Sequence, residues 1–409
     1  MKKQQKHLFT LVGLLMLVPS QTQAANIFVD AGGGCTLAEA INSANDDDAA
    51  GNGCVDGFEH DTITLETDIL LEEDEDARPP ITTSVTIEGQ GHTIDGNGKI
   101  GSVLKISRAI FDDVDPCIGG DLTLNNAMIT GGNHAHIGGV SLGMLNNGGG
   151  ITNACFGTVT MNNVTVSENT ALGNGGGIFN APWASLTLNN STVSGNHAGG
   201  IGGGGIYNND GAVVLNNSTV SNNIAEGNGG GICSEWLYGP DPAFVALLLG
   251  VDVSVSLNSS LVSGNTVTGT ASTGNEIYQS EVPVYGDNYN LFGHSNESDA
   301  AAFSGFAPGE NDVNATGGGI NGILIPTALS AIIDSLADNG GSTLTHALVP
   351  GSPAIDLDPA ACSTGLITDQ RGEPRPVGAG CDAGAYEVNI VSSNGNAFLP
   401  VLNFLLLRN

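Results

Sequence analysis

The chain has 409 residues and is strongly acidic, with 42 Asp and Glu against 10 Lys and Arg and a net charge of −32. Such a charge repels phosphates and anionic lipids, which argues against nucleic acid and anionic membranes as partners. Glycine accounts for 61 residues without a collagen period, a content typical of tight corners in a stacked β-fold.

Residues 1–24 have the three regions of a secretory signal. Three lysines precede an apolar run over residues 8–18, and small or polar residues end at Ala24. The run is about half of the roughly 20 residues that span a bilayer, so cleavage is favoured over anchoring. The mature chain would lose three lysines, carry a charge of −35, contain no membrane-spanning segment and be secreted or held at the cell surface.

Residues 25–60 are predicted to form an N-terminal cap. A strand at 26–29 is followed by Thr36 and Glu39, which have the spacing of a capping box, and by a helix with an apolar face over 37–44. Such a helix would cover the open end of a stack of strands. Cys35 and Cys54 flank it and would form a disulfide in an exported protein.

Residues 61–293 are organised by a repeat that is clearest between Val159 and Ser234. Asn162, Asn189 and Asn216 occupy the same place in successive copies, 27 residues apart. A fixed period of this length indicates a stacked repeat, and the short apolar alternations inside each copy indicate strands. The sequence therefore predicts an all-β fold, a right-handed parallel β-helix with coils of about 27 residues and an N-terminal capping helix.

The period also predicts which residues stack on one another. Two interior apolar columns are expected, Leu124, Met161, Leu188, Leu215 and Leu257, and Ile129, Val166, Val193, Val220 and Val262. Two asparagine ladders are expected at the corners, Asn125, Asn162, Asn189, Asn216 and Asn258, and Asn169, Asn196, Asn223 and Asn265.

One copy contains an insertion of 15 residues, because Asn216 and Asn258 are 42 apart. Insertions in repeat proteins form loops on one face, often the binding face. Trp236, Tyr238 and Phe244 lie in this stretch and would suit stacking on sugar rings; the alternative is that they fold over the side of the solenoid.

The other cysteines fit the same stack. Cys117 and Cys155 lie at neighbouring positions of successive coils, and Cys362 and Cys381 lie in the proline- and glycine-rich ending, so two further disulfides are expected. Cys233 remains and is interpreted as a buried structural thiol.

No cofactor is required by any motif, and no metal site is assigned to particular residues. Acidic clusters at 46–48, 72–76 and 112–115 offer oxygen ligands suited to calcium, but none has the spacing of a calcium-binding loop. Charge repulsion that keeps the solenoid soluble is the alternative explanation of these clusters.

Two resemblances follow from the motifs. The repeats GGGIFN, GGGIYN and GGGICS, each preceded by TVSxN, resemble those of pectin-lyase-like β-helix surface proteins and of polymorphic outer membrane proteins. Residues 294–388, with LADNGGSTLTHAL, GSPAID, DQRG and CDAGAYE, resemble the choice-of-anchor Q domain of exported bacterial proteins. The resemblance implies a surface or secreted β-helix without an established reaction, and the apolar tail 389–409 would be a sorting segment or a final strand.

One constellation in the ending has catalytic chemistry. Arg371 lies among several carboxylates, which would act as acid and base while the arginine polarises an acidic sugar; the group comprises Asp356, Asp369, Asp382 and Glu387. Arg108 is a further candidate near the first coils. The alternative is an ion-pair network that ties the last loops to the solenoid.

The sequence favours a non-catalytic, adhesin-like or structural surface protein that contacts glycans or cell-surface components. A polysaccharide lyase or glycoside hydrolase with the pectin-lyase-like fold is the alternative. Lyases of this fold use cationic groups on the coil face, and the regular repeats contain no Lys or Arg between Arg108 and Asn290.

Overall fold

The computed structural model describes residues 24–30, 34–46, 53–57, 60–72, 79–99, 101–106, 119–134, 147–154, 156–236, 253–286, 288–319, 321–359 and 362–389. The predicted signal up to residue 23, the tail beyond residue 389, Arg108, Tyr238, Phe244 and the Cys117–Cys155 pair lie outside these ranges and stay predictions. Within the described ranges, no helix has the length and apolar character needed to cross a membrane.

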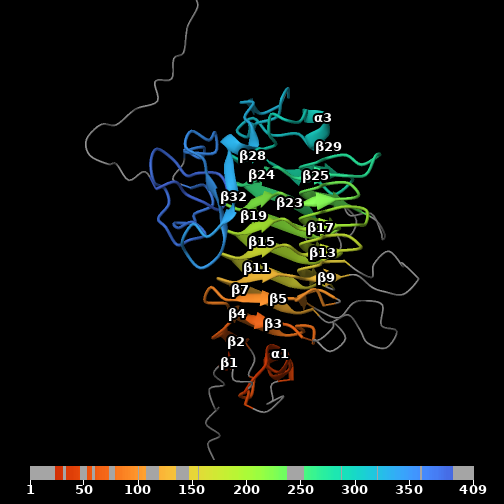
Figure 1. The fold of residues 1–409 in the computed structure, drawn as a ribbon, viewed down its shortest axis with the longest axis vertical. Helices are drawn as coiled ribbons and strands as arrows, with labels where there is room; N and C mark the ends of the chain where they lie inside the picture. The colour runs from red at the N-terminus through yellow and green to blue at the C-terminus, as the bar shows by residue number, and fades with distance from the viewer. Residues whose placement is uncertain are drawn as a thin grey trace, which may run out of the picture.

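The strands stack one coil above another into parallel sheets that run the length of the molecule (Figure 1). Sheet A contains β1 (Asn26–Val29), β2 (His60–Leu65), β4 (Ser84–Glu88), β7 (Asp121–Asn125), β11 (Thr158–Asn162), β15 (Ser185–Asn189), β19 (Ala212–Asn216), β23 (Ser254–Asn258) and β27 (Val284–Tyr285). Sheet B contains β3 (Ile69–Leu70), β5 (Thr93–Asp95), β8 (Met128–Thr130), β12 (Thr165–Ser167), β16 (Thr192–Ser194), β20 (Thr219–Ser221), β24 (Leu261–Ser263), β28 (Leu291–Phe292), β30 (Val313–Asn314) and β31 (Ile323–Leu324).

Two shorter sheets complete each coil. Sheet C contains β6 (Leu104–Ile106), β10 (Ile151–Asn153), β14 (Ile178–Asn180), β18 (Ile206–Asn209), β22 (Ile232–Glu235), β26 (Ile277–Gln279) and β29 (Phe303–Ser304). Sheet D contains β9 (Asn133–His134), β13 (Thr170–Ala171), β17 (His197–Ala198), β21 (Ile224–Ala225) and β25 (Thr266–Val267). The fold is a right-handed parallel β-helix, as predicted.

Both predicted apolar columns are confirmed. Met161 pairs with Leu188 in sheet A, and Val166 pairs with Val193 in sheet B, each in parallel register with its equivalent one coil away. Every member of the two columns is fully buried. A strand of three to five residues cannot bury its apolar face alone, so the stacking itself provides the core.

Both predicted asparagine ladders are present. In the outer ladder, each Nδ2 donates to the Oδ1 of the preceding coil over 2.8–2.9 Å, from Asn258 down to Asn125. In the inner ladder, each Nδ2 donates to the Oδ1 of the following coil over 2.9–3.0 Å, from Asn169 up to Asn265. A third ladder, which the sequence analysis missed, joins Asn153, Asn180 and Asn208.

The glycine run of each copy makes room for the inner ladder. A Cβ on Gly205 would lie 2.9 Å from Nδ2 of Asn223 and 2.8 Å from the carbonyl oxygen of Gly231. Any side chain at this position would therefore displace either the ladder amide or the neighbouring coil. The third glycine of each run is required by this close approach, whereas the first, such as Gly203 with a φ of 68°, is required by its left-handed backbone.

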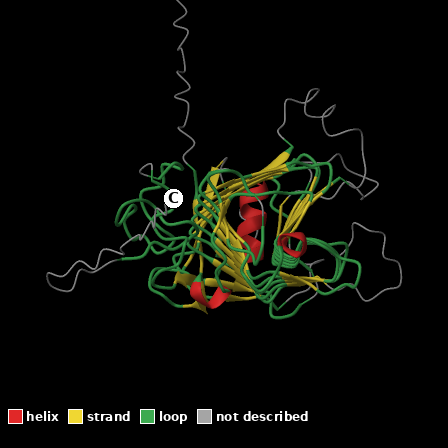
Figure 2. Ribbon diagram, turned by 90° about the horizontal axis from the view of Figure 1, so that it is seen from above, coloured by secondary structure: helices red, strands yellow, loops and turns green. Residues whose placement is uncertain are grey.

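Helix α1 (Leu37–Asp46) covers the first coil, as the capping-helix prediction requires (Figures 1 and 2). Thr36 and Glu39 form the expected capping box, with the Thr36 N–H donating to Oε2 over 2.8 Å and the Glu39 N–H donating to Oγ1 over 3.2 Å. The apolar face is buried, and a disulfide joins Cys35 to Cys54.

The opposite end continues beyond residue 293, because β29 extends sheet C and β30 and β31 extend sheet B. The short helix α3 (Asp299–Ala302) precedes β29. The chain then enters the 3-10 helix η2 (Leu329–Ala331) and an antiparallel hairpin of β32 (Ile333–Ala337) and β33 (Thr345–Leu348). Residues 329–389 are called the C-terminal brace below.

The C-terminal brace lies along the side of the stack, where its blue ribbon crosses the green and yellow coils (Figure 1). It contacts the outward-facing residues of sheet B: the Thr165 hydroxyl donates to the Leu344 carbonyl oxygen over 2.7 Å, and the Ala385 N–H donates to Oγ1 of Thr219 over 3.0 Å. A disulfide joins Cys362 to Cys381 within it. The brace therefore ties successive coils together from their side.

Candidate functional sites

The predicted catalytic constellation lies inside the C-terminal brace. Nε and Nη2 of Arg371 donate to Oδ2 of Asp369 over 2.9 and 2.7 Å, and Nη2 also donates to the carbonyl oxygen of Glu387 over 2.6 Å. The guanidinium lies 3.7 Å from the centre of the Tyr386 ring. Asp369 has no exposed surface and also accepts backbone N–H groups, among them that of Glu387 over 3.0 Å.

A second arginine, which the sequence analysis did not assign to the constellation, holds its other half. Arg375 donates to the carbonyl oxygens of Asp382 and Gly384 over 2.8 and 2.7 Å and lies 3.5 Å from Oε2 of Glu387. Asp382 accepts the backbone N–H of Asp356 over 2.8 Å. Burial, followed by the nearby Glu387 carboxylate, raises the pKa of Asp382 to about 7.

The carboxylates of this constellation hold the loops of the C-terminal brace together through hydrogen bonds. Asp369, Asp382 and Glu387 have no exposed surface, and backbone N–H groups donate to all three carboxylates. These three carboxylates are therefore covered by protein and held by the loops of the brace, which fits the ion-pair network that was the alternative interpretation. Asp356 joins the group through its own backbone N–H, and its Oδ1 accepts the N–H of Ala379 over 2.8 Å.

The predicted aromatic loop is described only at Trp236, which is partly buried immediately after β22. The corresponding corner of two earlier coils carries a pair that the sequence analysis missed. Phe156 stacks on Trp183 with the ring centroids 5.1 Å apart, and Phe156 is 46% exposed. Phe156 lies three residues after Asn153, which ends β10, and Trp183 lies three residues after Asn180, which ends β14. This regularity is visible in the sequence.

Both aromatic residues of this pair have left-handed backbones, with φ values of 62° and 64°. Bulky residues are uncommon in that region, and each such backbone conformation costs about 1–3 kcal/mol. The Phe156 ring is exposed, whereas Trp183 is partly buried. The backbone N–H of Trp183 donates to the carbonyl oxygen of Asp210 over 3.0 Å, which holds the corner to the next coil. Phe156 and Trp183 are called the aromatic corner below.

The prediction that Cys233 is a buried structural thiol agrees with the structure. Cys233 is a buried free thiol on β22. It pairs in register with Tyr207, whose ring stacks on Phe179 with centroids 5.6 Å apart. Burial raises the pKa of the Cys233 thiol well above its usual value, so the group remains protonated and structural.

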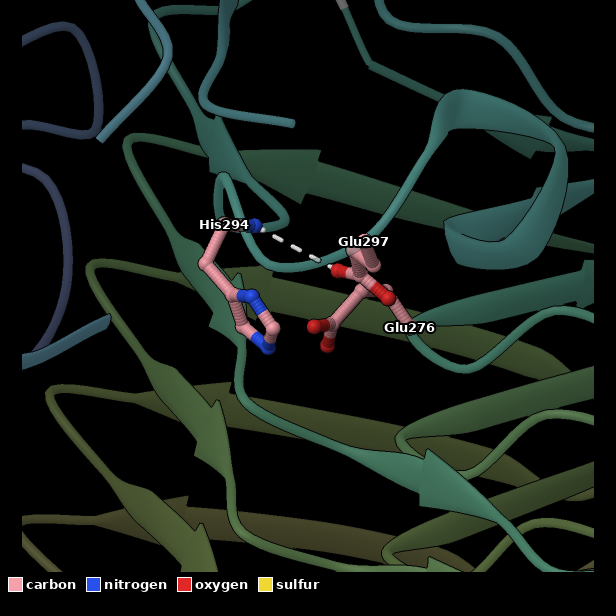
Figure 3. A group of neighbouring side chains, drawn as sticks. All are labelled: Glu276, His294 and Glu297. Carbon is pink, nitrogen blue, oxygen red and sulfur yellow. Dashed lines mark hydrogen bonds between the residues drawn. The ribbon is translucent and has the colours of Figure 1, made fainter. Parts of the chain in front are cut away.

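A cluster that the sequence analysis did not find lies near the C-terminal end of the stack (Figure 3). Glu276 precedes β26, and His294 and Glu297 lie in the turn after β28. One ligand atom from each residue lies within 4.8 Å of those of the other two. Glu276 is fully buried, whereas His294 and Glu297 are partly exposed.

Comparisons with known proteins place part of the chain in context. The model of a family described as a putative pectate lyase-like adhesive domain matches residues 59–199, which run from β2 to β17 and include the aromatic corner. Neither a search of curated proteins nor one of solved structures found a match. The family match supports a pectin-lyase-like β-helix of adhesin-like type. The resemblances to the choice-of-anchor Q domain and to polymorphic outer membrane proteins stay predictions.

Proposed function

We propose that the chain is an exported surface adhesin that binds glycans along its β-helix without cleaving them. The observation that carries the proposal is the aromatic corner, which lies within the residues that match the adhesive domain. Aromatic rings presented outward by a rigid backbone are suited to the apolar faces of sugar rings.

The arrangement of the other faces supports this location. The C-terminal brace covers the outer face of sheet B, where Thr165 and Thr192 have no exposed surface. A net charge of −32 also disfavours a polyanionic ligand on any side. The aromatic corner therefore points to neutral glycans in preference to polygalacturonate.

Export is supported by the two disulfides of the described structure, Cys35–Cys54 and Cys362–Cys381. Disulfides form and persist in oxidising compartments and are rare in the cytosol. The first disulfide pins the helical cap at the N-terminal end of the stack, and the second closes a loop of the brace along the side of the stack.

The test incubates the purified mature chain with neutral and acidic polysaccharides, with and without calcium, and measures retention and new sugar ends in the same wells. We expect retention of a neutral glycan without cleavage. Phe156→Asn and Trp183→Asn remove a ring but keep a residue that tolerates a left-handed backbone. Both should weaken retention, whereas Tyr285→Ala, which removes another exposed aromatic ring outside the matched residues, should not.

Release of new sugar ends by the native chain would contradict the proposal and support the carbohydrate-active alternative. Retention that survives both aromatic substitutions would place binding elsewhere, with the loop after Trp236 as the next candidate. No retention of any glycan would remove the proposed ligand class. A calcium requirement would identify a role for the acidic clusters.

A further inference from the structure

The position of Glu276 follows from the register of sheet C. Ile277 pairs with Ile232, so Glu276 takes the place that Gly231 occupies one coil earlier. A Cβ on Gly231 would lie 2.8 Å from Nδ2 of Asn265, the ladder asparagine of the next coil. The inner ladder ends at Asn265, and the side chain of Glu276 fills the space that a further asparagine would take.

Glu276 also takes over the hydrogen bonds of that missing asparagine. Its Oε2 accepts the backbone N–H of Asn265 over 3.2 Å and the Nδ2 of the same residue over 2.6 Å, as each ladder Oδ1 does for the coil before it. Its Oε1 accepts the N–H of Gly264 over 2.7 Å. A carboxylate offers two acceptor oxygens to these three donors, whereas a glutamine would present its NH2 group to one of them, so the end of the ladder selects a negative charge at this buried position.

A second carboxylate lies against this charge. Glu297 faces Glu276, and a carboxylate oxygen of each lies within 4.8 Å of the other. In the part of the chain that the structure describes, no Lys or Arg forms an ion pair with either residue. Two facing carboxylates without a basic partner must hold a proton or a cation between them.

The third member of the cluster is an imidazole, presented by a fixed turn. The Glu297 N–H donates to the carbonyl oxygen of His294 over 3.2 Å, which closes the turn. The Gly317 N–H donates to the carbonyl oxygen of Glu297 over 2.7 Å, and Nδ2 of Asn275 donates to its Oε2 over 3.0 Å. Figure 3 shows the imidazole and both carboxylates directed toward a common space.

We propose that Glu276, His294 and Glu297 bind one divalent transition-metal ion of the Zn²⁺ type, which clamps the last rung of the inner ladder to the following turn. One imidazole nitrogen and two carboxylate oxygens form a donor set found at zinc sites. Calcium and magnesium prefer oxygen ligands alone, so the imidazole favours zinc or manganese over both. The partly exposed His294 and Glu297 provide the route by which the ion enters.

The experiment uses the full mature chain, freed of metal with a chelator and then titrated with Zn²⁺, Mn²⁺ and Ca²⁺. Equilibrium dialysis gives the stoichiometry and Kd, and thermal unfolding gives the change in Tm. We expect one equivalent of Zn²⁺ per chain and a higher Tm in its presence, because an ion that binds only the folded state stabilises it. Calcium should not compete at equal concentration.

Three variants test the residues, and a fourth is the matched control. His294→Ala, Glu297→Gln and Glu276→Gln should each raise the Kd for Zn²⁺ by at least about tenfold. His197→Ala removes another partly exposed histidine of the solenoid and should leave the Kd unchanged. In the metal-free state, Glu297→Gln should have a Tm close to that of the native chain, because it leaves the three hydrogen bonds that Glu276 accepts in place and removes one of the two facing charges.

The proposal would be overturned if less than one equivalent of Zn²⁺ binds per chain or if calcium displaces zinc. It would also be overturned if His294→Ala binds Zn²⁺ with the same Kd as the native chain and the His197→Ala control. Binding by Glu276→Gln with native affinity would overturn it as well. The Tm of metal-free Glu297→Gln shows whether this variant is folded, so a loss of binding in it can be distinguished from unfolding.

Discussion

The inner asparagine ladder allows the stability of the solenoid to be tested at one side chain, by the substitution Asn196→Ala. Oδ1 of Asn196 accepts the backbone N–H and the Nδ2 of Asn169 over 3.1 and 3.0 Å. Its Nδ2 donates to the carbonyl oxygen of Val166 over 3.0 Å and to Oδ1 of Asn223 over 2.9 Å. The substitution removes these four hydrogen bonds at a fully buried position.

Water cannot replace them in the dry interior, so each lost hydrogen bond should cost about 1 kcal/mol or more. The expected loss is about 4 kcal/mol in the free energy of unfolding. Asn189→Ala is the matched control, since Asn189 belongs to the same coil and to the outer ladder. Its side chain makes two ladder bonds at a partly exposed position, where water can substitute, and the expected loss is below about 1 kcal/mol.

Urea denaturation followed by circular dichroism measures both costs, with the m-value checked for constancy. Hydrogen exchange should locate the damage of Asn196→Ala in its own coil and the two adjoining coils, because each repeat contacts only its neighbours. Equal costs for the two substitutions, or a larger cost for Asn189→Ala, would refute the reasoning that burial sets the value of a ladder rung.

Three further predictions concern the glycine run and the C-terminal brace. Gly205→Ala should destabilise the chain by about 1–3 kcal/mol in the same assay, whereas Gly318→Ala, where a Cβ meets nothing within 4 Å, should be neutral. Gln370→Ala removes hydrogen bonds to the Thr165 and Thr192 hydroxyls and to the brace itself, so limited proteolysis should cleave the brace faster than in the native chain. Glu373→Ala alters an exposed residue of the brace and should leave the rate of cleavage unchanged. Burial lowers the pKa of His346, whose ring nitrogens contact the Ser194 hydroxyl and the Asp334 carbonyl oxygen, below its unfolded value near 6.5. The unfolded chain then binds more protons than the folded chain, so this contribution to stability should be lost as the pH falls below about 6.5. The drop in Tm between pH 7.5 and pH 5 should therefore be larger for the native chain than for His346→Gln. An equal drop in the two proteins would contradict the prediction.

The fold was predictable because one period controls both its core and its corners. A spacing of 27 residues puts Leu188 on Met161 and Asn189 on Asn162, and no long-range information beyond the repeat is needed to name the columns. The helix α1 was predictable for a similar reason, since its capping box and apolar face are local. Both disulfides of the described structure lie within 19 residues of sequence.

The C-terminal brace was not predictable, because its contacts are separated by more than a hundred residues. Thr192 alternates with the core residue Val193 and so points away from the interior, yet it is fully buried and donates to Oε1 of Gln370 over 2.7 Å. The recurrence of Thr and Ser at the same outward positions of β12, β16 and β20 is the signal that a polar partner covers this face. The pairing of Arg371 with Asp369 is local in sequence, but the burial of Asp369 is visible only in the fold, so the sequence could not decide between catalytic chemistry and an ion-pair network.

Glu276 was missed because its meaning depends on register. The segment Gly274-Asn275-Glu276-Ile277-Tyr278 is a further copy of the glycine motif, in which asparagine and glutamate replace the second and third glycines. Without the structure the exchange appears to be divergence of a terminal repeat. With the register known, the same exchange marks the point at which the inner ladder stops.

The two ladders show why glutamates occur at such points. A ladder of side-chain amides has a direction, and its last Nδ2 needs an acceptor that itself donates nothing. The outer ladder runs toward the N-terminus and ends where Nδ2 of Asn125 donates to Oε1 of Glu88 over 2.6 Å. The inner ladder runs toward the C-terminus and ends on Glu276. Glu88 is partly exposed and water can solvate its charge, whereas Glu276 is buried beside a second carboxylate. The same capping chemistry is therefore complete at one end of the solenoid, and at the other it leaves a buried charge that a bound cation would neutralise.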